Sequence, residues 1–267
     1  MDNLYVIKIG GNIIDAPALL DDFLQQFASL EGKKILVHGG GKLATRLAEK
    51  LGIPQQLVDG RRITDEETLQ IVTMVYAGQI NKTIVAKLQA LDCNALGVTG
   101  ADGNLILAHK RKAAVDYGFV GDIDSVEIDQ LKNLLEHHNT VVVAPITHDG
   151  RGQLLNTNAD TIAQELARAA TSFMNTTLVY CFEKRGVLRD KEDENSVIRQ
   201  ITPDSYLTIM QEKINDQPVI TEGMIPKIEN ALKAVKDGVG RVIIGQAQEL
   251  KLLINGLAGT VLQNEQP

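Results

Sequence analysis

A lysine inside an apolar run is the first residue of this chain that raises a chemical question. Lys8 lies within Tyr-Val-Ile-Lys-Ile-Gly-Gly-Asn, residues 5–12, and residues 4–9 have the composition of a buried strand. An ammonium group rarely enters such a strand without a partner, because burying an unpaired charge is costly. Gly10 and Gly11 follow at once, and they leave backbone N–H groups accessible to a ligand. We therefore expect an anion at the end of this strand.

A second glycine run follows the next apolar segment. Residues 34–38 are followed by Gly39, Gly40 and Gly41, and then by leucines at helical spacing. In open α/β sheets, ligands bind beyond the carboxyl ends of the strands, and a helix that begins there adds its positive end. A tight turn with positive φ needs one glycine, so a run of three favours a main-chain cradle for an anion. His38, directly before the cradle, is expected to be structural rather than catalytic.

Two known phosphate-binding motifs fit this glycine run poorly. The Walker pattern fails, because Leu36 takes the place of its first glycine and Leu43 follows Lys42. The dinucleotide pattern fits loosely, as a Gly-x-Gly-x-x-Ala run from residue 39 with Asp59 downstream, and it leaves the first glycine pair unexplained. A nicotinamide-dependent oxidoreductase is therefore a minor alternative.

Three further side chains lie at the starts of predicted helices. Lys227 is in a first turn, where a positive charge is unfavourable unless it binds an anion or is solvated. Asp160 is also in a first turn, where a carboxylate is favourable, and Asn158 is a suitable cap for that helix. Asn156 lies two residues earlier, where an extended chain directs it the same way as Asn158. A simple cap explains Asn158 and Asp160 but does not explain Asn156.

Adjacent arginines precede the longest predicted helix. Arg61 and Arg62 present guanidinium groups, which grip carboxylates in a bidentate way. An ion pair with Asp65 or Glu66 would explain the two arginines equally well. Thr64, followed three residues later by a glutamate, predicts a capping box at the start of a helix that continues to about residue 91.

Composition limits the classes of function. The chain has 267 residues, 44% of them hydrophobic and 23% charged, as expected for a globular protein with a sizeable core. With 27 basic and 34 acidic residues, its net charge of −7 argues against a nucleic-acid surface. No run approaches the ~20 apolar residues of a membrane span, and residues 1–9 lack the features of a signal peptide. Cys93 and Cys181 are far apart, as expected for reduced, buried thiols of a cytosolic protein, with a disulfide as the minor alternative.

Apolar runs alternate with segments of helical period along the chain. Predicted strands span residues 4–9, 34–38, 95–99, 140–145, 177–182 and 241–245. Predicted helices span residues 18–30, about 43–51, 64–91, 127–137, 159–170, 203–211 and 225–235. Many of the strands show no polar–apolar alternation, which is typical of strands covered on both faces. The order predicts an α/β fold in which a mostly parallel sheet is covered by helices on both sides.

One segment interrupts this alternation. Residues 102–122 contain short apolar pieces among glycines, which predict a hairpin lying off the main sheet. A boundary between two lobes is expected near residues 170–176. The predicted division is an N-terminal lobe of residues 1–172 and a C-terminal lobe of residues 173–267.

The ordered set of motifs resembles the amino acid kinase family. The set comprises Lys-x-Gly-Gly at the first strand, His-Gly-Gly-Gly at the second, Gly-x-Arg-x-Thr from residue 60, Asn-x-Asn-Ala-Asp from residue 156 and Gly-Met-x-x-Lys from residue 223. The resemblance covers nearly the whole chain in order, from Lys8 to Lys227. It implies a three-layer αβα sandwich with two lobes. It also implies phosphorylation of the γ-carboxylate of N-acetyl-L-glutamate by ATP, in arginine biosynthesis. The acylated amino acid would bind to the N-terminal lobe, which also forms the dimer, and ATP to the C-terminal lobe.

The resemblance also implies residue roles. Lys8 and Lys227 would neutralise charge on the phosphoryl group in flight, and Asp160 would hold the two ammonium groups in place. The implied contacts to the acylated amino acid are Gly40, Gly41, Arg62 and Asn156. The implied contacts to the nucleotide are Gly10, Gly11, Glu183, Gly186 and Val187. No metal site on the protein is implied, because Mg²⁺ arrives with ATP.

Some features leave alternatives open. Relatives usually carry Asp-Val-x-Gly-Val on the nucleotide side, where residues 183–187 are Glu-Lys-Arg-Gly-Val, and the extra positive charge is expected to alter nucleotide contacts. N-succinyl-L-glutamate is an alternative substrate, because residues 98–103 and 156–158 do not discriminate between the acyl groups. A non-catalytic amino-acid or nucleotide sensor with this fold is the alternative from another class, although loss of a lysine or of Asp160 would be its signature.

The resemblance also bears on assembly and location. Relatives that are regulated by arginine carry an additional N-terminal helix that interlaces dimers into a hexamer, and Lys8 lies too near the start of this chain for such a helix. We therefore expect a homodimer, paired through the long helix after Thr64, without feedback by arginine. The expected partners are small-molecule substrates, with no nucleic acid and no membrane, and the expected location is cytoplasmic.

Overall fold

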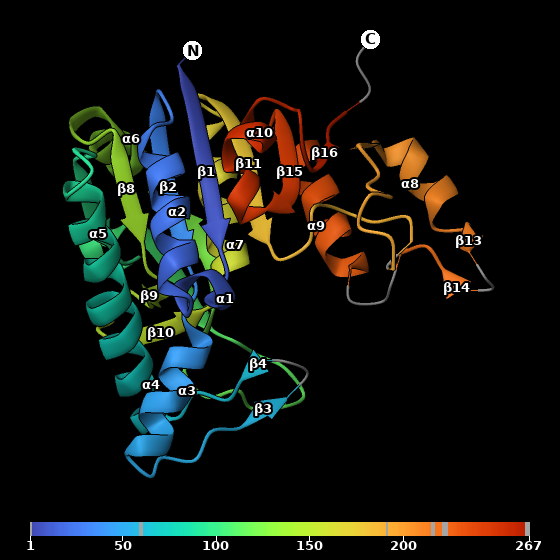
Figure 1. The fold of residues 1–267 in the computed structure, drawn as a ribbon. Helices are drawn as coiled ribbons and strands as arrows, with labels where there is room; N and C mark the ends of the chain where they lie inside the picture. The colour runs from blue at the N-terminus through green and yellow to red at the C-terminus, as the bar shows by residue number, and fades with distance from the viewer. Residues whose placement is uncertain (1, 59–60, 191, 215–216, 221–223, 265–267) are drawn as a thin grey trace.

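Strands and helices that alternate in sequence form three layers, with one sheet between two layers of helices (Figure 1). The computed structural model describes residues 2–58, 61–190, 192–214, 217–220 and 224–264. The strands of the main sheet are β1 (Asn3–Ile9), β2 (Lys33–His38), β5 (Ala95–Val98), β8 (Thr140–Val143), β11 (Asn175–Phe182), β12 (Gln200–Ile201), β15 (Arg241–Gln246) and β16 (Thr260–Leu262). Their order is β12-β16-β15-β11-β1-β2-β8-β5, and every neighbouring pair except β15–β16 is parallel. The mostly parallel sheet expected from the sequence is thus confirmed.

The helices divide between the two faces of this sheet. One core contains the buried side chains of α2 (Pro17–Ala28), α3 (Gly41–Lys50), α4 (Glu66–Thr73), α5 (Asn81–Gln89) and α10 (Leu250–Ile254). The opposite core contains those of α6 (Ile128–His137), α7 (Ala159–Ala170), α8 (Pro203–Ile209) and α9 (Ile225–Lys236). The short α1 (Gly11–Ile14) links β1 to α2, and single 3₁₀ turns lie at Asp102–Asn104 and Ala247–Glu249. Helices on both faces explain why the central strands are apolar without alternation.

The alternation of side chains along β1 determines the direction of Lys8. Leu4 and Val6 pack in the core that contains α7, whereas Ile7 and Ile9 pack in the core on the opposite face. Successive side chains of a strand point to opposite faces of the sheet. Lys8 therefore lies on the same face as Leu4 and Val6, and its side chain extends toward α7.

Short strands outside the main sheet complete the fold. A closed four-stranded sheet consists of β6 (Ile106–Lys110), β7 (Val120–Val126), β9 (Ile146–His148) and β10 (Leu154–Thr157). The antiparallel pairing of β6 with β7 confirms the hairpin expected off the main sheet. Two-stranded ribbons pair β3 (Leu57–Val58) with β4 (Arg61–Arg62), and β13 (Lys213–Ile214) with β14 (Gln217–Pro218). The small sheet matters for the site because β10 leads directly into α7.

The start of the long helix differs from the capping box expected from the sequence. Asp65, rather than Thr64, is the N-cap, and its carboxylate accepts a hydrogen bond from the backbone N–H of Thr68 at 2.8 Å. Thr64 is buried, and its hydroxyl accepts a hydrogen bond from Nδ2 of Asn156 at 3.0 Å. An aspartate caps as well as a threonine, so the tertiary contact to Asn156 determines which one is used. The expected length of the helix is confirmed, although Met74–Ile80, between α4 and α5, is π-helical.

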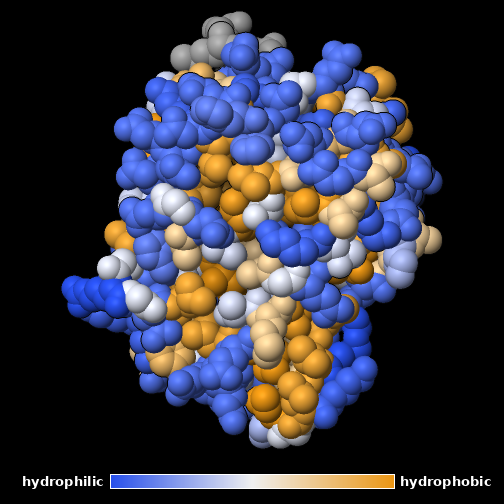
Figure 2. Space-filling view, turned by 90° about the vertical axis from the view of Figure 1, so that its left-hand side faces the viewer, coloured by the Kyte–Doolittle hydropathy of each residue, from blue (hydrophilic) through white to orange (hydrophobic). Residues whose placement is uncertain are grey.

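The long helix occupies one side of the molecule. Figure 2 shows this side of the molecule, with apolar side chains gathered in the lower half of the view. Met74, in the π-helical segment, is 55% exposed, and Leu51, just after α3, is 57% exposed. Within the described part of the chain, no helix has the length and apolar character needed to cross a membrane.

Candidate active site

An ion pair joins β1 to α7. Nζ of Lys8 lies 2.8 Å from Oδ1 of Asp160, and the Lys8 side chain is only 12% exposed. Asp160 is in the first turn of α7, where Asn158 caps the helix by accepting hydrogen bonds from the N–H groups of Asp160 and Thr161. The carboxylate compensates the ammonium charge that the strand would otherwise bury alone. The lysine in the apolar strand therefore has a partner in the protein itself.

Lys227 reaches the same neighbourhood from the other end of the chain. It lies in the first turn of α9, as expected from the sequence, and its Nζ is 4.2 Å from the centre of the Phe182 ring. Lys227, Phe182 and Asp160 line one small cavity together with Tyr180 and Asn230. Tyr180 pairs with Lys8 across β1 and β11, and its hydroxyl donates a hydrogen bond to the carbonyl of Asp160. The structure thus brings together the two lysines and the aspartate that the sequence singled out.

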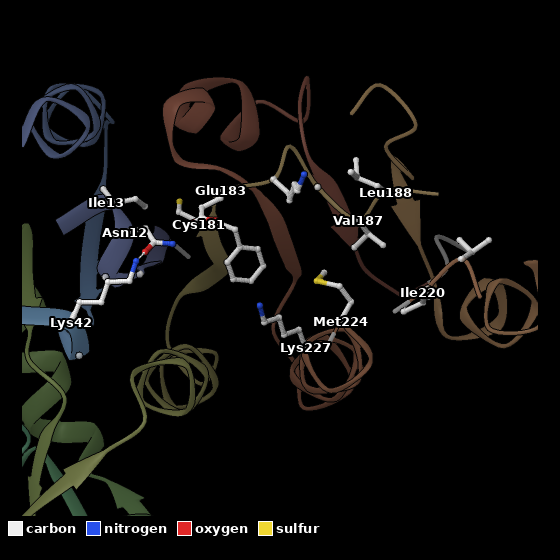
Figure 3. A pocket seen from close by; sticks show the side chains of 17 residues that line it. Asn12, Ile13, Lys42, Cys181, Glu183, Val187, Leu188, Ile220, Met224 and Lys227 are labelled. Carbon is white, nitrogen blue, oxygen red and sulfur yellow. Dashed lines mark hydrogen bonds between the residues drawn. The ribbon is translucent and has the colours of Figure 1, made fainter. Parts of the chain in front are cut away.

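A larger cavity of about 560 Å³ opens beside this cluster (Figure 3). Its lining contains every residue that the sequence predicted for the nucleotide side: Gly10, Gly11, Glu183, Gly186 and Val187. The side chains of Leu188, Ile220 and Met224 form an apolar part of the wall, which suits a flat ring system. Cys181 also lines the cavity, and burial raises the pKa of its thiol to about 12, so this part of the wall is neutral.

Two cations on the nucleotide side have acidic partners. Nζ of Lys184 is 3.5 Å from Oε1 of Glu194, and the guanidinium of Arg185 is 3.1 Å from Oε1 of Glu249. The extra positive charge that the sequence places between residues 183 and 187 is therefore largely offset within the protein. Glu183, the acidic residue of this segment, lines the cavity.

A second cavity, of about 270 Å³, lies on the other side of the glycine loops. All the residues that the sequence predicted for the acylated amino acid line it: Gly40, Gly41, Arg62 and Asn156. The backbone at Gly40 has a φ of 156°, and a Cβ atom there would lie 2.3 Å from Cδ1 of Ile80, so a glycine is needed. This position accounts for one glycine of the run of three.

Arg62 is held in this second cavity by hydrogen bonds rather than by the acidic residues near it in sequence. Its guanidinium donates to the carbonyl of Gly41 at 2.9 Å, to the hydroxyl of Thr45 at 2.8 Å and to the side chain of Gln55. Among the ion pairs between described residues, none joins Arg62 to Asp65 or to the glutamate that follows it. The charge of Arg62 therefore remains available to a bound anion.

Two further guanidinium groups line the second cavity. Arg61 is one of them, and the other is Arg111, which sequence reasoning missed. Arg111 donates to both carboxylate oxygens of Asp122 at 2.5 to 3.1 Å, and this pairing holds the pKa of Asp122 below its usual range. Arg111 leaves no signal in sequence, because it follows β6 in a segment outside the main sheet. Tertiary folding alone brings it to the site.

Among the described residues, Gly41 is shared by the two cavities. The end of β2 and the start of α3 therefore separate the two spaces. The ion pair lies close to the first glycine loop, since Nζ of Lys8 is 4.0 Å from where a Cβ atom on Gly10 would be, and Gly10 lines the larger cavity. This geometry suits the transfer of an anionic group from a ligand in one cavity to a ligand in the other.

His38 and the cysteines have structural positions. His38 is fully buried, hydrogen-bonds through Nδ1 to the carbonyl of Gly39, and burial lowers its pKa to about 4. It is therefore neutral at pH 7, in agreement with the structural role expected for it. Cys93 and Cys181 are free, buried thiols, as predicted. Among the described residues, no group of His, Cys, Asp or Glu side chains is arranged to hold a metal ion.

Comparison with known proteins agrees with this geometry. The profile of the amino acid kinase family matches residues 3–246. The chain belongs to the amino acid kinase family. It is 58% identical over 257 residues to the acetylglutamate kinase of Cytophaga hutchinsonii, with 96% of each chain covered. It is 51% identical to the acetylglutamate kinase of Phocaeicola vulgatus, covering 98% of this chain and 99% of that one.

A solved structure shows that the amino acid kinase fold extends over the whole chain. The N-acetylglutamate synthase of Neisseria gonorrhoeae, in complex with coenzyme A and N-acetyl-glutamate, superposes with a TM-score of 0.78. The match covers 100% of this chain and 60% of that one, at 20% identity. The likeness therefore concerns the fold, and the residues of the site must be argued from this structure.

The Lys8–Asp160 pair gives a prediction for stability. Substitution Asp160→Asn keeps the cap geometry but leaves the buried ammonium without a compensating charge, so the free energy of unfolding should fall by about 1–3 kcal/mol. Urea denaturation at pH 7 measures the loss. Asp21→Asn is the control, because it removes an ion pair to Lys87 in which both side chains are more than a third exposed. It should cost less than about 1 kcal/mol. Equal losses in the two variants would contradict the assignment of a buried, compensated pair.

Proposed function

We propose that this chain transfers the γ-phosphoryl group of ATP to the γ-carboxylate of N-acetyl-L-glutamate, which forms an acyl phosphate. This reaction would be the second step of arginine biosynthesis. The observation that carries the proposal is the position of Lys8, Asp160 and Lys227 beside two cavities that meet at Gly41. The identity to relatives named acetylglutamate kinase supports the choice of substrate.

The proposed chemistry needs charge neutralisation rather than a general base. A γ-carboxylate is already ionised at pH 7, so no proton has to be removed before it attacks phosphorus. The difficulty lies in bringing two anions together, which positioned ammonium groups and Mg²⁺ bound to ATP relieve. Lys8 and Lys227 take this role, and the N–H of Gly11 donates to the transferred group. Asp160 pairs with Lys8 and lines the small cavity that Lys227 also lines, from which it would hold both ammonium groups in place. A neutral, buried His38 is consistent with a mechanism that uses no histidine.

The linings of the two cavities support the proposed division into lobes. The smaller cavity is lined by residues between Gly39 and Ala159, all within the proposed N-terminal lobe of residues 1–172. The larger cavity is lined mainly by residues from Cys181 to Lys227, together with the glycine loops. We therefore assign the acylated amino acid to the smaller cavity, and ATP to the larger one and the lobe of residues 173–267. A cytoplasmic location, where ATP is available, remains part of the proposal.

An assay of ADP release tests the function. The purified chain should turn over N-acetyl-L-glutamate with ATP and Mg²⁺, and should use free glutamate and aspartate poorly. Lys8→Met and Lys227→Met should each lower kcat by about a hundredfold or more, because each removes charge compensation from the transition state. Lys233→Met is the control, since Lys233 lies in the last turn of α9, away from the cavities. A chain that binds ligands without turnover would instead be a sensor, and binding of NADH would favour an oxidoreductase.

A second candidate substrate is favoured by one observation. N-acetyl-L-glutamate brings one carboxylate, the α-carboxylate, to the smaller cavity, because its γ-carboxylate must face ATP. The cavity nevertheless holds Arg61 and Arg111 in addition to Arg62, and only Arg111 has an acidic partner among the described ion pairs. The acyl group of N-succinyl-L-glutamate carries a further carboxylate, which the guanidinium of Arg61 suits.

The choice between the two acyl groups can be measured. If succinyl is the natural acyl group, Arg61→Gln should raise the KM for N-succinyl-L-glutamate about tenfold to a hundredfold. This increase corresponds to the loss of one hydrogen bond to a charged group. The KM for N-acetyl-L-glutamate should change by less than about threefold. Lys112→Gln is the control, because Lys112, next to Arg111 in the chain, is an exposed cation that does not line the cavity. A wild-type chain that does not phosphorylate N-succinyl-L-glutamate would remove this candidate and leave the acetyl substrate.

We also propose that the chain forms a homodimer through the long helix after Thr64. The solvent face of that helix carries Met74, a large apolar side chain that is 55% exposed, followed by the small residues Ala77 and Gly78. Small residues let two helices approach closely, and an exposed apolar side chain between them gains by burial.

Substitution Met74→Glu tests this dimer. A glutamate at a symmetric helix contact would face its own copy, so the wild-type dimer mass in sedimentation velocity should change to a monomer mass. Leu207→Glu is the control, because Leu207 on α8 is 65% exposed and lies far from the long helix in the fold (Figure 1). A wild-type mass of six subunits, or inhibition by millimolar arginine, would contradict the proposed assembly.

A further inference from the structure

Lys42 is a third lysine at the cavity assigned to ATP. It is in the first turn of α3, directly after the glycine loop, and it lines the larger cavity together with Gly10 and Gly11. Figure 3 shows its side chain extending to Asn12, and its Nζ donates a hydrogen bond to Oδ1 of that residue. The family resemblance assigned no role to either side chain. Both therefore need a separate explanation.

Lys42 forms no ion pair with a carboxylate among the described residues. Among the ion pairs between described residues, none includes Lys42, and its partner Asn12 is a neutral amide. Lys8 and Lys184, by contrast, each have a carboxylate partner. The first turn of a helix also disfavours a cation, because the N-terminal end carries a partial positive charge. The Lys42 side chain is exposed, so its ammonium is accessible to an anion that binds in the cavity it lines.

The place of Lys42 in the fold identifies which anion that is. Its neighbour Gly41 is the residue that lines both cavities, so Lys42 lies on the larger-cavity side of their junction. The group that crosses this junction in the proposed function is the γ-phosphoryl group of the nucleotide. The adenine and the acyl group would lie in the two cavities away from the junction.

We propose that Lys42 is a further catalytic residue, which contacts the γ-phosphoryl group during its transfer, and that Asn12 is a positioning residue that orients this ammonium. The inference rests on the proposed function. In the step itself, a γ-carboxylate oxygen forms a bond to phosphorus while the bond between phosphorus and the bridging oxygen of ADP breaks. ADP leaves with that electron pair, and no proton is transferred.

The charges around the transferred group explain why another ammonium is useful. The pair of Lys8 with Asp160 is neutral overall, so these two side chains add a local dipole but no net charge. Lys227 contributes one net positive charge, and Lys42 contributes a second. The incoming carboxylate and the phosphoryl oxygens are all anionic, so the second charge lowers the cost of bringing them together.

The experiment compares substitutions at two lysines of the same helix. Lys42→Met should lower kcat about a hundredfold and leave the KM for the acylated amino acid within about twofold, because the contact strengthens in the transition state. Lys42→Arg should restore part of the rate, since it keeps the charge. Lys50→Met is the matched control, because Lys50 is exposed in the last turn of α3, and it should have the wild-type kcat. Thermal unfolding should give the same Tm for both Met variants.

The outcomes distinguish a failure of the role of Lys42 from a failure of the proposed function. If the wild-type chain turns over and Lys42→Met retains the wild-type kcat, the role of Lys42 is overturned while the proposed function stands. If the wild-type chain releases no ADP with any acylated amino acid, the proposed function itself fails. A loss of kcat in Lys42→Met that Lys50→Met shares would also overturn the inference, because it would indicate a general effect of charge on α3.

Discussion

The ion pair between Lys8 and Asp160 is the constraint on which the rest of the structure depends. A lysine in the central strand of a buried sheet is tolerated because a carboxylate from α7 meets it at 2.8 Å. This contact ties β1 to the start of α7, and α7 in turn follows β10, the strand that carries Asn156. The proposed reactive centre and the wall of the smaller cavity are therefore positioned by the same few elements.

The glycine loops give the site its division into two spaces. β1 and β2 are parallel neighbours, so the loops that follow them emerge side by side at the same edge of the sheet. Gly40 has no room for a Cβ atom against Ile80, and Gly41 is exposed to both cavities. A main-chain partition of this kind lets two ligands approach each other without a side chain between them.

The distribution of charge differs between the two spaces. On the nucleotide side, Lys184 and Arg185 are offset by glutamates, whereas Lys42 and Lys227 remain without carboxylate partners among the described residues. In the smaller cavity, Arg111 is offset by Asp122, and Arg61 and Arg62 are not offset by described carboxylates. Residual positive charge thus gathers where anionic groups of the two substrates would bind, although the chain as a whole carries a net charge of −7.

The sequence by itself determined those parts of the protein that depend on local pattern. The apolar runs and helical periods predicted the main strands and helices, because burial on both faces requires nearly continuous apolar residues in a parallel strand. Glycines and lysines also marked the site, because a lysine in an apolar strand or in a first helical turn is costly without a ligand or partner. Asn156 marked the region around Asp160, because a simple helix cap leaves it unexplained.

The tertiary structure decided what depends on contacts between distant segments. Asp65 rather than Thr64 caps the long helix, since the Thr64 hydroxyl is engaged by Asn156 from another strand. Arg111 enters the smaller cavity only because a hairpin outside the main sheet folds over it. The pairing of Lys42 with Asn12 likewise requires the starts of α1 and α3 to meet at one edge of the sheet. Such contacts leave no periodic trace in the sequence, because they join residues whose separation along the chain has no fixed relation to their distance in space.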